Sequence, residues 1–402
     1  MTQEKMPQDW QHFPQVVRLI DFAKQSASAE RGFGYLDSRG ALDPSVPPSL
    51  LVTSRMTFSF ATGSTLGIDG CRTLVERGVK SLLEDFHDTI NGGFHSSLGE
   101  SPSAASKSAY DTAFVLFASS SAYAAGVSEA REVAEIALDT MLNRFWRDDL
   151  GIFSNSFNAD FSLSEPYLGA NANMHSVEAL MAAGTALNDP SLLDKAQAIS
   201  QFLIDHHARK TQWLVPEHFD LDGRPLWEFN ADIPDDEFRP YGVTVGHLFE
   251  WSRLLMELSQ SGVRDSEWMP DAARELYQTA KRIGWAADGK EGFVYTLDWD
   301  EKPIITERLL WVLAEAICAA VEMTAEGTVE GSHQDVERWQ HLLETTFVDS
   351  THGGWHHQLT ADGEPSSTIA RGKPDAYHLI QALIAPHLPR GAGILERLQR
   401  RL

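Results

Sequence analysis

A short phrase recurs along the chain and constrains its fold more than any other feature. Each copy has a run of alternating aromatic and polar residues, and the copies begin at Gly32, Gly93, Gly151, Gln212, Gly292 and Gly354. Such alternation beside turn residues is typical of a short β-hairpin. Successive copies start 58 to 80 residues apart, which leaves room for a hairpin and two ordinary helices in each unit. Six helix pairs that close into a ring form an (α/α)6 barrel, so we predict an all-α fold with short β-hairpins in its connecting loops.

The composition fits one globular domain with a small-molecule ligand. No linker rich in Ser, Gly or Pro interrupts the repeat, so residues 1–402 are predicted to form a single barrel domain. The formal net charge of −24 would repel phosphodiester backbones and anionic lipids, so we expect no nucleic-acid or membrane partner. The two cysteines, Cys71 and Cys318, provide neither a disulfide framework nor zinc-ligand spacing.

The chain carries no pattern typical of export or membrane insertion. Residues 1–9 lack the apolar core of a signal peptide. An uncharged apolar run of the roughly 20 residues that a bilayer requires is also absent from the sequence. We therefore expect a cytoplasmic protein.

Two kinds of helical pattern alternate along the chain. Runs beginning near residues 51, 107, 167, 243, 307 and 375 are largely apolar on every side, which predicts an inner ring. Amphipathic runs such as 68–86, 128–143, 191–206 and 271–284 suit an outer ring. Near the starts of the inner runs stand Arg55, Tyr110, His175, His247, Trp311 and His378. Their separations follow the repeat, so we expect these six side chains to converge on one pocket at one mouth of the barrel.

Three chemistries fit such a pocket. Zinc could bind three histidines, but here each comes from a different unit and no His-x-x-x-His pair is present. Glycoside hydrolysis needs two opposed carboxylates, which could come from Asp111, Glu178, Glu250 or Glu315. Proton transfer beside a carbonyl would use histidines as base and acid near neutral pH, with an arginine stabilising an enediolate. Glu178 and Glu250 each follow a histidine by three residues, which also suits orientation of an imidazole.

Four motifs together carry a family resemblance. They are Asn-Ala-Asn-Met-His (171–175), Val-Gly-His-Leu-Phe-Glu-Trp (245–251), Trp-Val-Leu-Ala-Glu-Ala (311–316) and Ala-Tyr-His (376–378). In combination they closely resemble the N-acylglucosamine 2-epimerase superfamily, and within it the aldose–ketose isomerase branch, which includes mannose and sulfoquinovose isomerases. The resemblance extends from Arg55 to His378. It implies an (α/α)6 barrel that isomerises or epimerises aldoses at carbon 2 without a metal or other cofactor.

The resemblance also implies roles for individual residues. His247 and His378 would be the catalytic acid/base pair that moves a proton between C2 and C1 through a cis-enediol. Trp311 would stack on the sugar. The hydroxyl-binding residues would be Arg55, Asn171, His175, Glu250 and Gln358, which would also assist ring opening. Tyr110 joins this substrate-binding set because of its place at the start of an inner run.

The expected substrate is a small, uncharged monosaccharide. A sulfonated sugar would require cationic partners, and Arg55 alone does not indicate such a site. The favoured reaction is therefore D-mannose to D-fructose. The alternatives are a sugar 2-epimerase of the N-acylglucosamine or cellobiose type, a glycoside hydrolase on the same barrel, and a sugar- or nucleotide-binding protein without turnover. The long insertion at 217–242 is expected to help exclude water from an enediol.

Overall fold

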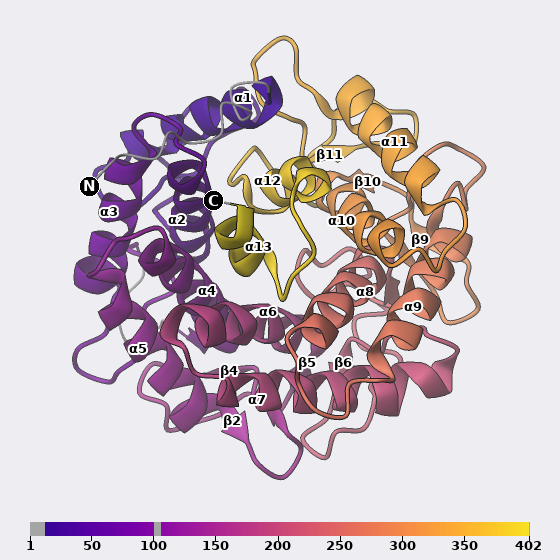
Figure 1. Cartoon of the computed structure of the whole chain (residues 1–402), viewed down its shortest axis with the longest axis horizontal. Helices are drawn as coiled ribbons and strands as arrows, with labels where there is room; N and C mark the ends of the chain where they lie inside the picture. Colours follow the sequence, from indigo (N-terminus) through magenta and orange to yellow (C-terminus); the bar gives the residue numbers. More distant parts are fainter. Residues whose placement is uncertain (1–12, 100–105, 402) are drawn as a thin grey trace.

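The computed structural model describes residues 13–99 and 106–401 and consists of two concentric rings of helices (Figure 1). The inner ring contains α2 (Leu50–Thr65), α4 (Ala109–Ala124), α6 (Ala170–Leu187), α8 (Val245–Gln260), α10 (Leu310–Glu326) and α12 (Tyr377–Ile384). The outer ring contains α1 (Pro14–Ala23), α3 (Cys71–Ser81), α5 (Ala130–Thr140), α7 (Ser191–Ser200), α9 (Met269–Gly284) and α11 (Ser332–Leu342). The predicted (α/α)6 barrel is confirmed.

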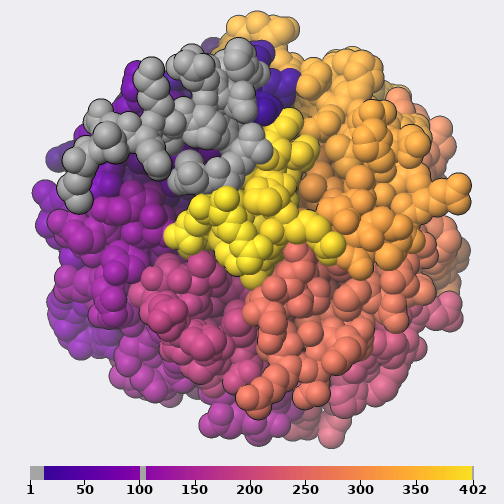
Figure 2. All heavy atoms as spheres, in the orientation of Figure 1, coloured from indigo at the N-terminus to yellow at the C-terminus, as the bar shows by residue number. Residues whose placement is uncertain are grey.

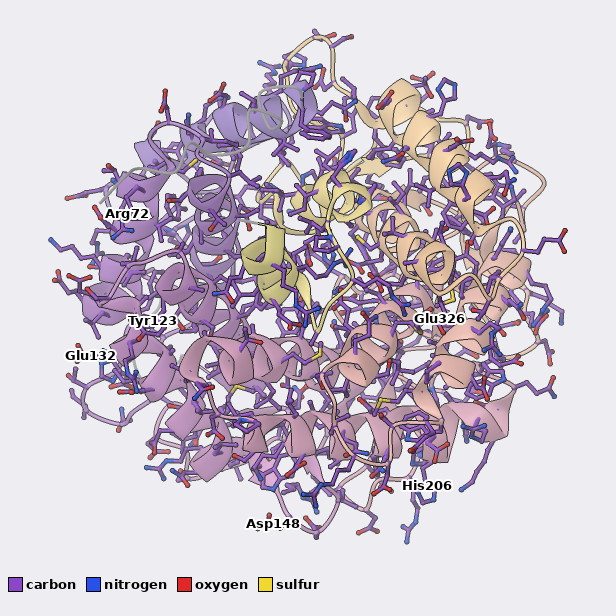
Figure 3. The ribbon with its side chains drawn as sticks, viewed as in Figure 1. Arg72, Tyr123, Glu132, Asp148, His206 and Glu326 are labelled. Atoms are coloured by element: carbon purple, nitrogen blue, oxygen red, sulfur yellow. The ribbon has the colours of Figure 1, made fainter. Side chains whose placement is uncertain are left out.

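Burial explains which helices take which ring. The inner helices are covered on nearly every side, as their apolar runs require. In the outer helices one face is buried, and α9 illustrates this with Ala272, Leu276 and Ile283. The opposite faces are exposed to solvent, and charged side chains such as Arg72 and Glu132 project outward from the circumference of the barrel (Figure 3). The width of the apolar surface of a helix therefore indicates whether the helix belongs to the inner or the outer ring.

Four of the six recurring phrases close a short hairpin behind an outer helix. In each, the aromatic residue pairs with the residue that follows the outer helical segment: His87 with Phe94, Trp146 with Phe153, Trp285 with Phe293 and Val348 with Trp355. The Trp146 pair belongs to β2 (Trp146–Arg147) and β3 (Ile152–Phe153). In the first unit the pairing is between Leu36 and Leu42 instead.

The fourth phrase does not form the predicted hairpin. Gln212 and Trp213 have φ angles of 55° and 70° and close a short 3₁₀ turn, η6 (Ala208–Thr211). Neither residue pairs with a strand in the described part of the chain. Two successive left-handed residues reverse the chain here, so the alternation seen in the sequence is not that of an extended strand.

A second set of strand pairs joins neighbouring units around one rim of the barrel. The residues that lead into an inner helix pair with the hairpin of the next unit: β1 (Lys107–Ser108) with β4 (Ser156–Phe157), β5 (Leu168–Gly169) with β6 (His218–Phe219), β7 (Val243–Thr244) with β8 (Thr296–Leu297), and β10 (Arg308–Leu309) with β11 (Gln358–Leu359). β9 (Pro303–Ile305) pairs antiparallel with β8 and makes this sheet three-stranded. The last unit reaches the first through Lys373, whose N–H donates to the carbonyl of Leu36 at 2.8 Å. The amino ends of the inner helices are therefore tied into one rim.

The opposite end of the barrel is covered by the C-terminal segment. Helix α13 (Ile394–Arg401) lies at the centre of the face seen in Figures 1 and 2. Its Arg397 contacts Glu257 of α8 and Glu322 of α10, both near the carboxyl ends of those helices. One end of the barrel is thus filled, which leaves the strand-linked rim as the end that holds a site. No helix among the described residues is long and apolar enough to cross a bilayer, and residues 1–9 lie outside the described part.

Candidate functional site

A cavity of about 130 Å³ opens at the strand-linked rim. That volume holds roughly ten water molecules at ~10–15 Å³ each, which is comparable with the size of one monosaccharide. Eight of the nine site residues predicted from the sequence line it: Arg55, Tyr110, Asn171, His175, His247, Glu250, Trp311 and His378. Residues contributed by six different inner helices therefore surround one small space.

These side chains do not occupy the same position in each inner helix, and they lie at two different depths in the cavity. Tyr110, Asn171 and Trp311 are the second residues of their helices, at the mouth of the cavity. Arg55 and His175 each lie about one turn further into a helix. The cavity therefore has an upper and a lower polar level, with aromatic side chains at the mouth and the densest charge at the floor.

Gln358, the ninth predicted residue, does not line the cavity. It is 1% exposed, and its Oε1 accepts from the backbone N–H groups of Ile369 and Ala370. Its Nε2 donates to Thr368 at 2.7 Å. Because alternate residues of a strand face opposite sides, the neighbouring His357 faces the cavity instead. Gln358 supports the loop that forms the wall, and His357 is the side chain available to a ligand.

Glu217 and Tyr295, which the sequence analysis did not select, occupy the same structural position as His357. In each case the residue precedes a rim strand, and its carbonyl accepts a hydrogen bond from the first N–H of an inner helix. The N–H of Ala170 donates to Glu217, that of Val245 to Tyr295, and that of Leu310 to His357. Tyr295 and His357 line the cavity, and Glu217 contacts His247. Their place at the cavity depends on the register of the hairpin strands relative to the inner helices, for which the sequence offers no local signal.

The two histidines proposed as acid and base have matching surroundings. Nδ1 of His247 lies 2.8 Å from Oε1 of Glu217, and Nδ1 of His378 lies 2.8 Å from Oε1 of Glu315. A carboxylate at this distance holds the proton on Nδ1, which leaves the Nε2 lone pair for a ligand. Neither Nε2 has a hydrogen-bond partner among the described residues. Both imidazoles are therefore held in a fixed orientation, with Nε2 available to a ligand.

Trp311 lies between these histidines. Its ring centroid is 5.2 Å from that of His247 and 5.6 Å from that of His378. Gly246 makes this packing possible, because a Cβ there would lie 2.2 Å from Cζ3 of Trp311. A hexose resting on the indole can therefore reach an imidazole on either side.

Arg55 is held rigidly on another side of the cavity. Its guanidinium donates to Asp375 at 3.1 Å and to the Tyr110 hydroxyl at 2.8 Å. It also stacks over Phe114 at 4.4 Å from the ring centroid. These contacts place a fixed positive charge at the cavity wall, which suits the stabilisation of an oxyanion.

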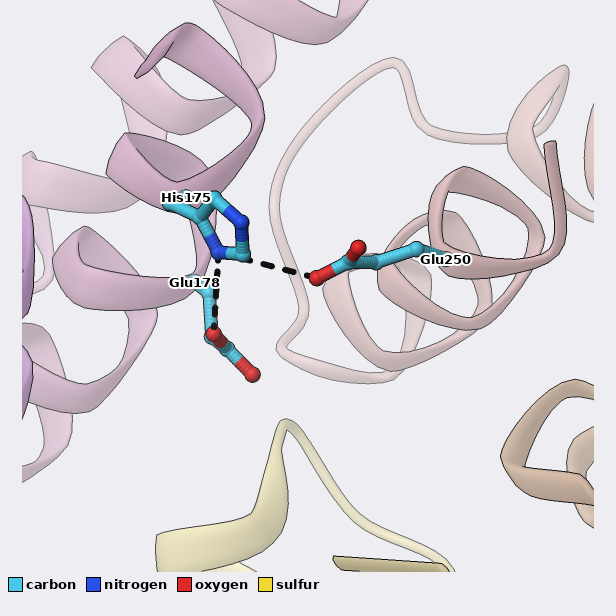
Figure 4. Close-up of side chains that lie close together, drawn as sticks. All are labelled: His175, Glu178 and Glu250. Carbon is cyan, nitrogen blue, oxygen red and sulfur yellow. Dashed lines mark ion pairs between the residues drawn. The ribbon is translucent and has the colours of Figure 1, made fainter. Parts of the chain in front are cut away.

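His175 and Glu250 provide polar groups without partners deep in the cavity. Nδ1 of His175 lies 3.7 Å from Glu178 and 3.6 Å from Glu250, as the ion-pair lines in Figure 4 mark, and both distances are too long for a hydrogen bond. Both carboxyl oxygens of Glu250 and Oδ1 of Asn171 are likewise buried without a hydrogen-bond partner among the described residues. Buried polar atoms of this kind are available to a ligand.

Burial controls the protonation of this cluster. It lowers the pKa of His175 to about 4, so the imidazole is neutral at neutral pH. The pKa of His378 is also lowered by burial, against the opposing effect of Glu315. Burial and then the negative charge of Glu315 raise the pKa of Glu250 well above its ordinary value. Glu250 therefore favours its neutral acid form, in which it can donate a hydrogen bond.

The donor atoms near the floor could in principle hold a metal ion. His175, Glu178 and Glu250 form one candidate set, and Glu250, Glu315 and His378 form another. However, the guanidinium of Arg253 already lies 3.2 Å from Glu178 and 3.0 Å from Glu315. A metal ion in either set would therefore have to compete with this fixed cation for a carboxylate.

Comparisons with known proteins agree with this architecture. Residues 32–382 match the family described as N-acylglucosamine 2-epimerase (GlcNAc 2-epimerase). The chain is 41% identical to a D-mannose isomerase of Pseudomonas cannabina pv. alisalensis, over 92% of this chain and 91% of the relative. It is 38% identical to a D-mannose isomerase of Thermobifida fusca, over 92% of each chain. A solved D-mannose isomerase structure superimposes with a TM-score of 0.85 at 24% identity, covering 95% of this chain and 99% of the other. The chain therefore belongs to the N-acylglucosamine 2-epimerase family.

Proposed function

We propose that the protein is a cofactor-independent aldose–ketose isomerase that converts D-mannose to D-fructose. The observation that carries the proposal is the pair of histidines, His247 and His378, each oriented by a carboxylate and placed on either side of Trp311. Acid/base transfer between adjacent carbons needs two such groups within reach of one substrate. The relatives that carry the name D-mannose isomerase, at 41% and 38% identity, support the choice of sugar.

The proton movements follow from the chemistry of the open-chain sugar. One imidazole takes the proton from C2 while O1 gains a proton, which gives a cis-enediol. A proton is then delivered to C1 while the C2 hydroxyl loses its own, which leaves a carbonyl at C2. Because an imidazole can act as a general base in one step and as a general acid in the next, His247 and His378 can share these transfers. Arg55 supplies positive charge for the oxygen that becomes negative.

Ring opening precedes these steps and requires a donor to the ring oxygen. Glu250 suits this role because its carboxyl favours the protonated form and has no hydrogen-bond partner among the described residues. Neutral His175 and the Oδ1 atom of Asn171 can bind neighbouring hydroxyls. In place of Gln358, His357 is the candidate for a further hydroxyl contact because it lines the cavity.

The charge on the cavity wall favours an uncharged sugar. Two arginines line the cavity, and both face carboxylates: Arg55 pairs with Asp375 at 3.1 Å, and Arg371 faces Glu237. An anionic substrate would have to compete with these acids for the guanidinium groups. The balance supports a neutral aldohexose such as mannose over a sulfonated or phosphorylated one.

The insertion at 217–242 contributes a wall of this cavity through Glu237, Phe238 and Pro240. The carbonyl of Pro240 lies 2.9 Å from Nε2 of His218, which fixes the end of the loop beside the rim. We propose that this wall keeps water from the enediol.

We also propose a cytoplasmic setting for the enzyme, with a role in carbohydrate metabolism. Cys71 and Cys318 are both buried and unpaired, which suits a reducing compartment. The whole chain would then act as one catalytic domain.

Substitution of Gly246 by alanine is expected to weaken sugar binding. The added methyl group would collide with Trp311 and displace the indole from the cavity. The KM for mannose should rise by about tenfold, which corresponds to ~1.4 kcal/mol, with a smaller change in kcat. Steady-state kinetics would measure both. Gly184→Ala is a matched control, because its added Cβ meets no atom closer than 3.3 Å and the residue does not line the cavity. An unchanged KM in Gly246→Ala would contradict contact between Trp311 and the sugar.

A screen of free aldoses for ketose formation tests the function directly. We expect fructose from mannose, at an undiminished rate when a chelator is present. Accumulation of glucose as the sole product from mannose would indicate a 2-epimerase instead. Release of free sugar from an oligosaccharide would indicate a hydrolase, although Asp111, one of its candidate carboxylates, does not line the cavity. Saturable sugar binding without turnover would indicate a binding protein.

A further inference from the structure

A column of buried ionisable side chains runs along the barrel axis, from the cavity floor to the C-terminal helix. We call it the axial column, and its members are Glu178, Glu250, Arg253, Glu257, Glu315, Glu322 and Arg397. None of these residues is more than 4% exposed. The last member, Arg397, comes from α13, which contributes no residue to the cavity.

An unbroken series of contacts joins Arg397 to a proposed catalytic histidine. The guanidinium of Arg397 lies 3.4 Å from Oε1 of Glu257, and Oε2 of Glu257 lies 3.3 Å from Arg253. Nε of Arg253 donates to Oε2 of Glu315 at 3.0 Å, and Oε1 of Glu315 lies 2.8 Å from Nδ1 of His378. Glu257 and Glu315 each contact the preceding member of the series through one carboxylate oxygen and the following member through the other. A change of charge at Arg397 can therefore alter the electrostatic environment of the His378 imidazole.

The balance of charge in the axial column indicates an electrostatic role for Arg397 in addition to packing. The axial column contains five carboxyl groups and two guanidinium groups. Arg253 lies within 3.6 Å of four of these carboxyl groups, Glu178, Glu250, Glu257 and Glu315. Arg397 contacts Glu257 and Glu322, and without it Glu257 would have Arg253 as its only cationic contact among the described residues. Its presence leaves Arg253 available to Glu315.

The surroundings of His378 define what such a change would do. The charged or titratable groups that face it come from every neighbouring element: Glu315 from α10, Arg55 from α2, His175 from α6, Glu250 from α8, His357 from the rim, and Asp375 and Tyr377 beside it. Of these, only Glu315 contacts its Nδ1. If Arg253 moved toward Glu257, Glu315 would lose part of its compensating charge and would attract a proton on His378 more strongly.

We propose that Arg397 is a positioning residue for the isomerase site, which it serves by keeping Arg253 on Glu315 and thereby keeping His378 a neutral, correctly oriented base. The inference rests on the proposed function. The C-terminal helix would then be part of the catalytic apparatus although it lies at the far end of the barrel.

Arg397 also has contacts that are purely structural. Its Nε donates to the carbonyl of Pro389 at 2.8 Å, and another nitrogen donates to that of Ala385 at 3.2 Å. A role as a simple plug would depend on these bonds and on packing, whereas the proposed role depends on positive charge beside Glu257. Variants that separate charge from shape therefore decide between the two.

The test compares Arg397→Met, Arg397→Lys and the double variant Glu257→Gln/Arg397→Met in the full-length protein. We expect Arg397→Met to lower kcat by about 3- to 30-fold with KM nearly unchanged, as for other residues that act through a coupled network. NMR titration of His378 should show a raised pKa, and the acidic limb of kcat should move to higher pH. Removal of the Glu257 charge in the double variant should restore both values toward wild type. Arg397→Lys should retain kcat within about twofold while losing thermal stability.

The matched control is Arg400→Gln, on the exposed side of the same helix, which should leave kcat, KM and the His378 titration unchanged. A double variant no better than Arg397→Met, or an equal loss of kcat in Arg397→Lys, would overturn the proposal in favour of a plug. If Arg397→Met does not fold, the lysine variant alone decides. If wild-type protein isomerises no aldose, the proposed function fails, while the His378 titrations still test the coupling itself.

Discussion

Alanine at His247 or at His378 is expected to lower kcat by about 100- to 10,000-fold, the usual loss when a general acid or base is removed. Each imidazole has its Nδ1 committed to a carboxylate, so the lost group is the Nε2 that faces the substrate. Steady-state kinetics with mannose would measure kcat and KM separately. Because Arg55, Asn171 and Trp311 line other parts of the cavity, KM should change far less than kcat.

Two controls make this result specific. His333 is 68% exposed on an outer helix, and its replacement by alanine should leave kcat unchanged. Circular dichroism of each cavity variant should match wild type, because both histidines lie against open space at the cavity. Retention of more than about a tenth of the wild-type kcat in either variant would contradict its assignment as acid or base.

Arg253→Met is expected to destabilise the fold by about 3–5 kcal/mol, the cost of leaving buried charges without a partner. Arg253 is 2% exposed and lies within 3.3 Å of Glu178, Glu257 and Glu315. Chemical denaturation at neutral pH would measure the loss through the transition midpoint. The control is Arg282→Met, whose exposed ion pair with Glu301 should contribute less than about 1 kcal/mol.

The effect of Arg253→Met should shrink in acid. In the wild-type protein burial alone would raise the pKa of Glu178, but the charge of Arg253 and hydrogen bonds hold it to about 2, below the ordinary value of 4.5. A depressed carboxyl pKa contributes stability that is present above the unfolded-state value and is lost as pH falls through the folded-state value. The variant lacks most of this contribution, so the two proteins should differ most above about pH 4.5 and should converge below it. A difference independent of pH would indicate lost packing instead.

The ring architecture and most of the cavity lining could be read from the sequence, because both depend on local patterns. Helices without a polar face predict an inner ring whatever their partners are. The polar residues near their starts, such as Arg55 and His175, must then lie near one rim. This reasoning locates a residue to within about one helical turn, which is why the two depths of the cavity lining were missed.

Strand register is where sequence reasoning failed. Gln358 and His357 are neighbours in a short extended segment, and a shift by one residue reverses which of them faces the cavity. The segment around these two residues carries no alternation long enough to decide which of them faces the cavity. Backbone pairing of Gln358 with Leu309 sets the register, and that partner is distant in the sequence.

The carboxylates that contact the two proposed acid/base histidines were not identified from the sequence. Glu178 and Glu250 follow histidines by three residues, but neither makes a hydrogen bond to the imidazole beside it. The observed partners are Glu217, 30 residues from His247, and Glu315, 63 residues from His378. Both contacts depend on which inner helices and rim strands become neighbours when the ring closes. Arg397 is a more extreme case, because it reaches Glu257 across 140 residues.

Isomerisation of mannose in deuterated water, followed by NMR of the fructose at low conversion, tests the central claim most directly. If imidazoles move the proton between C2 and C1, the removed proton can exchange with solvent. We expect fructose that carries solvent deuterium at C1. Fructose that has kept the original C2 hydrogen at C1, with no solvent deuterium, would contradict acid/base transfer by His247 and His378.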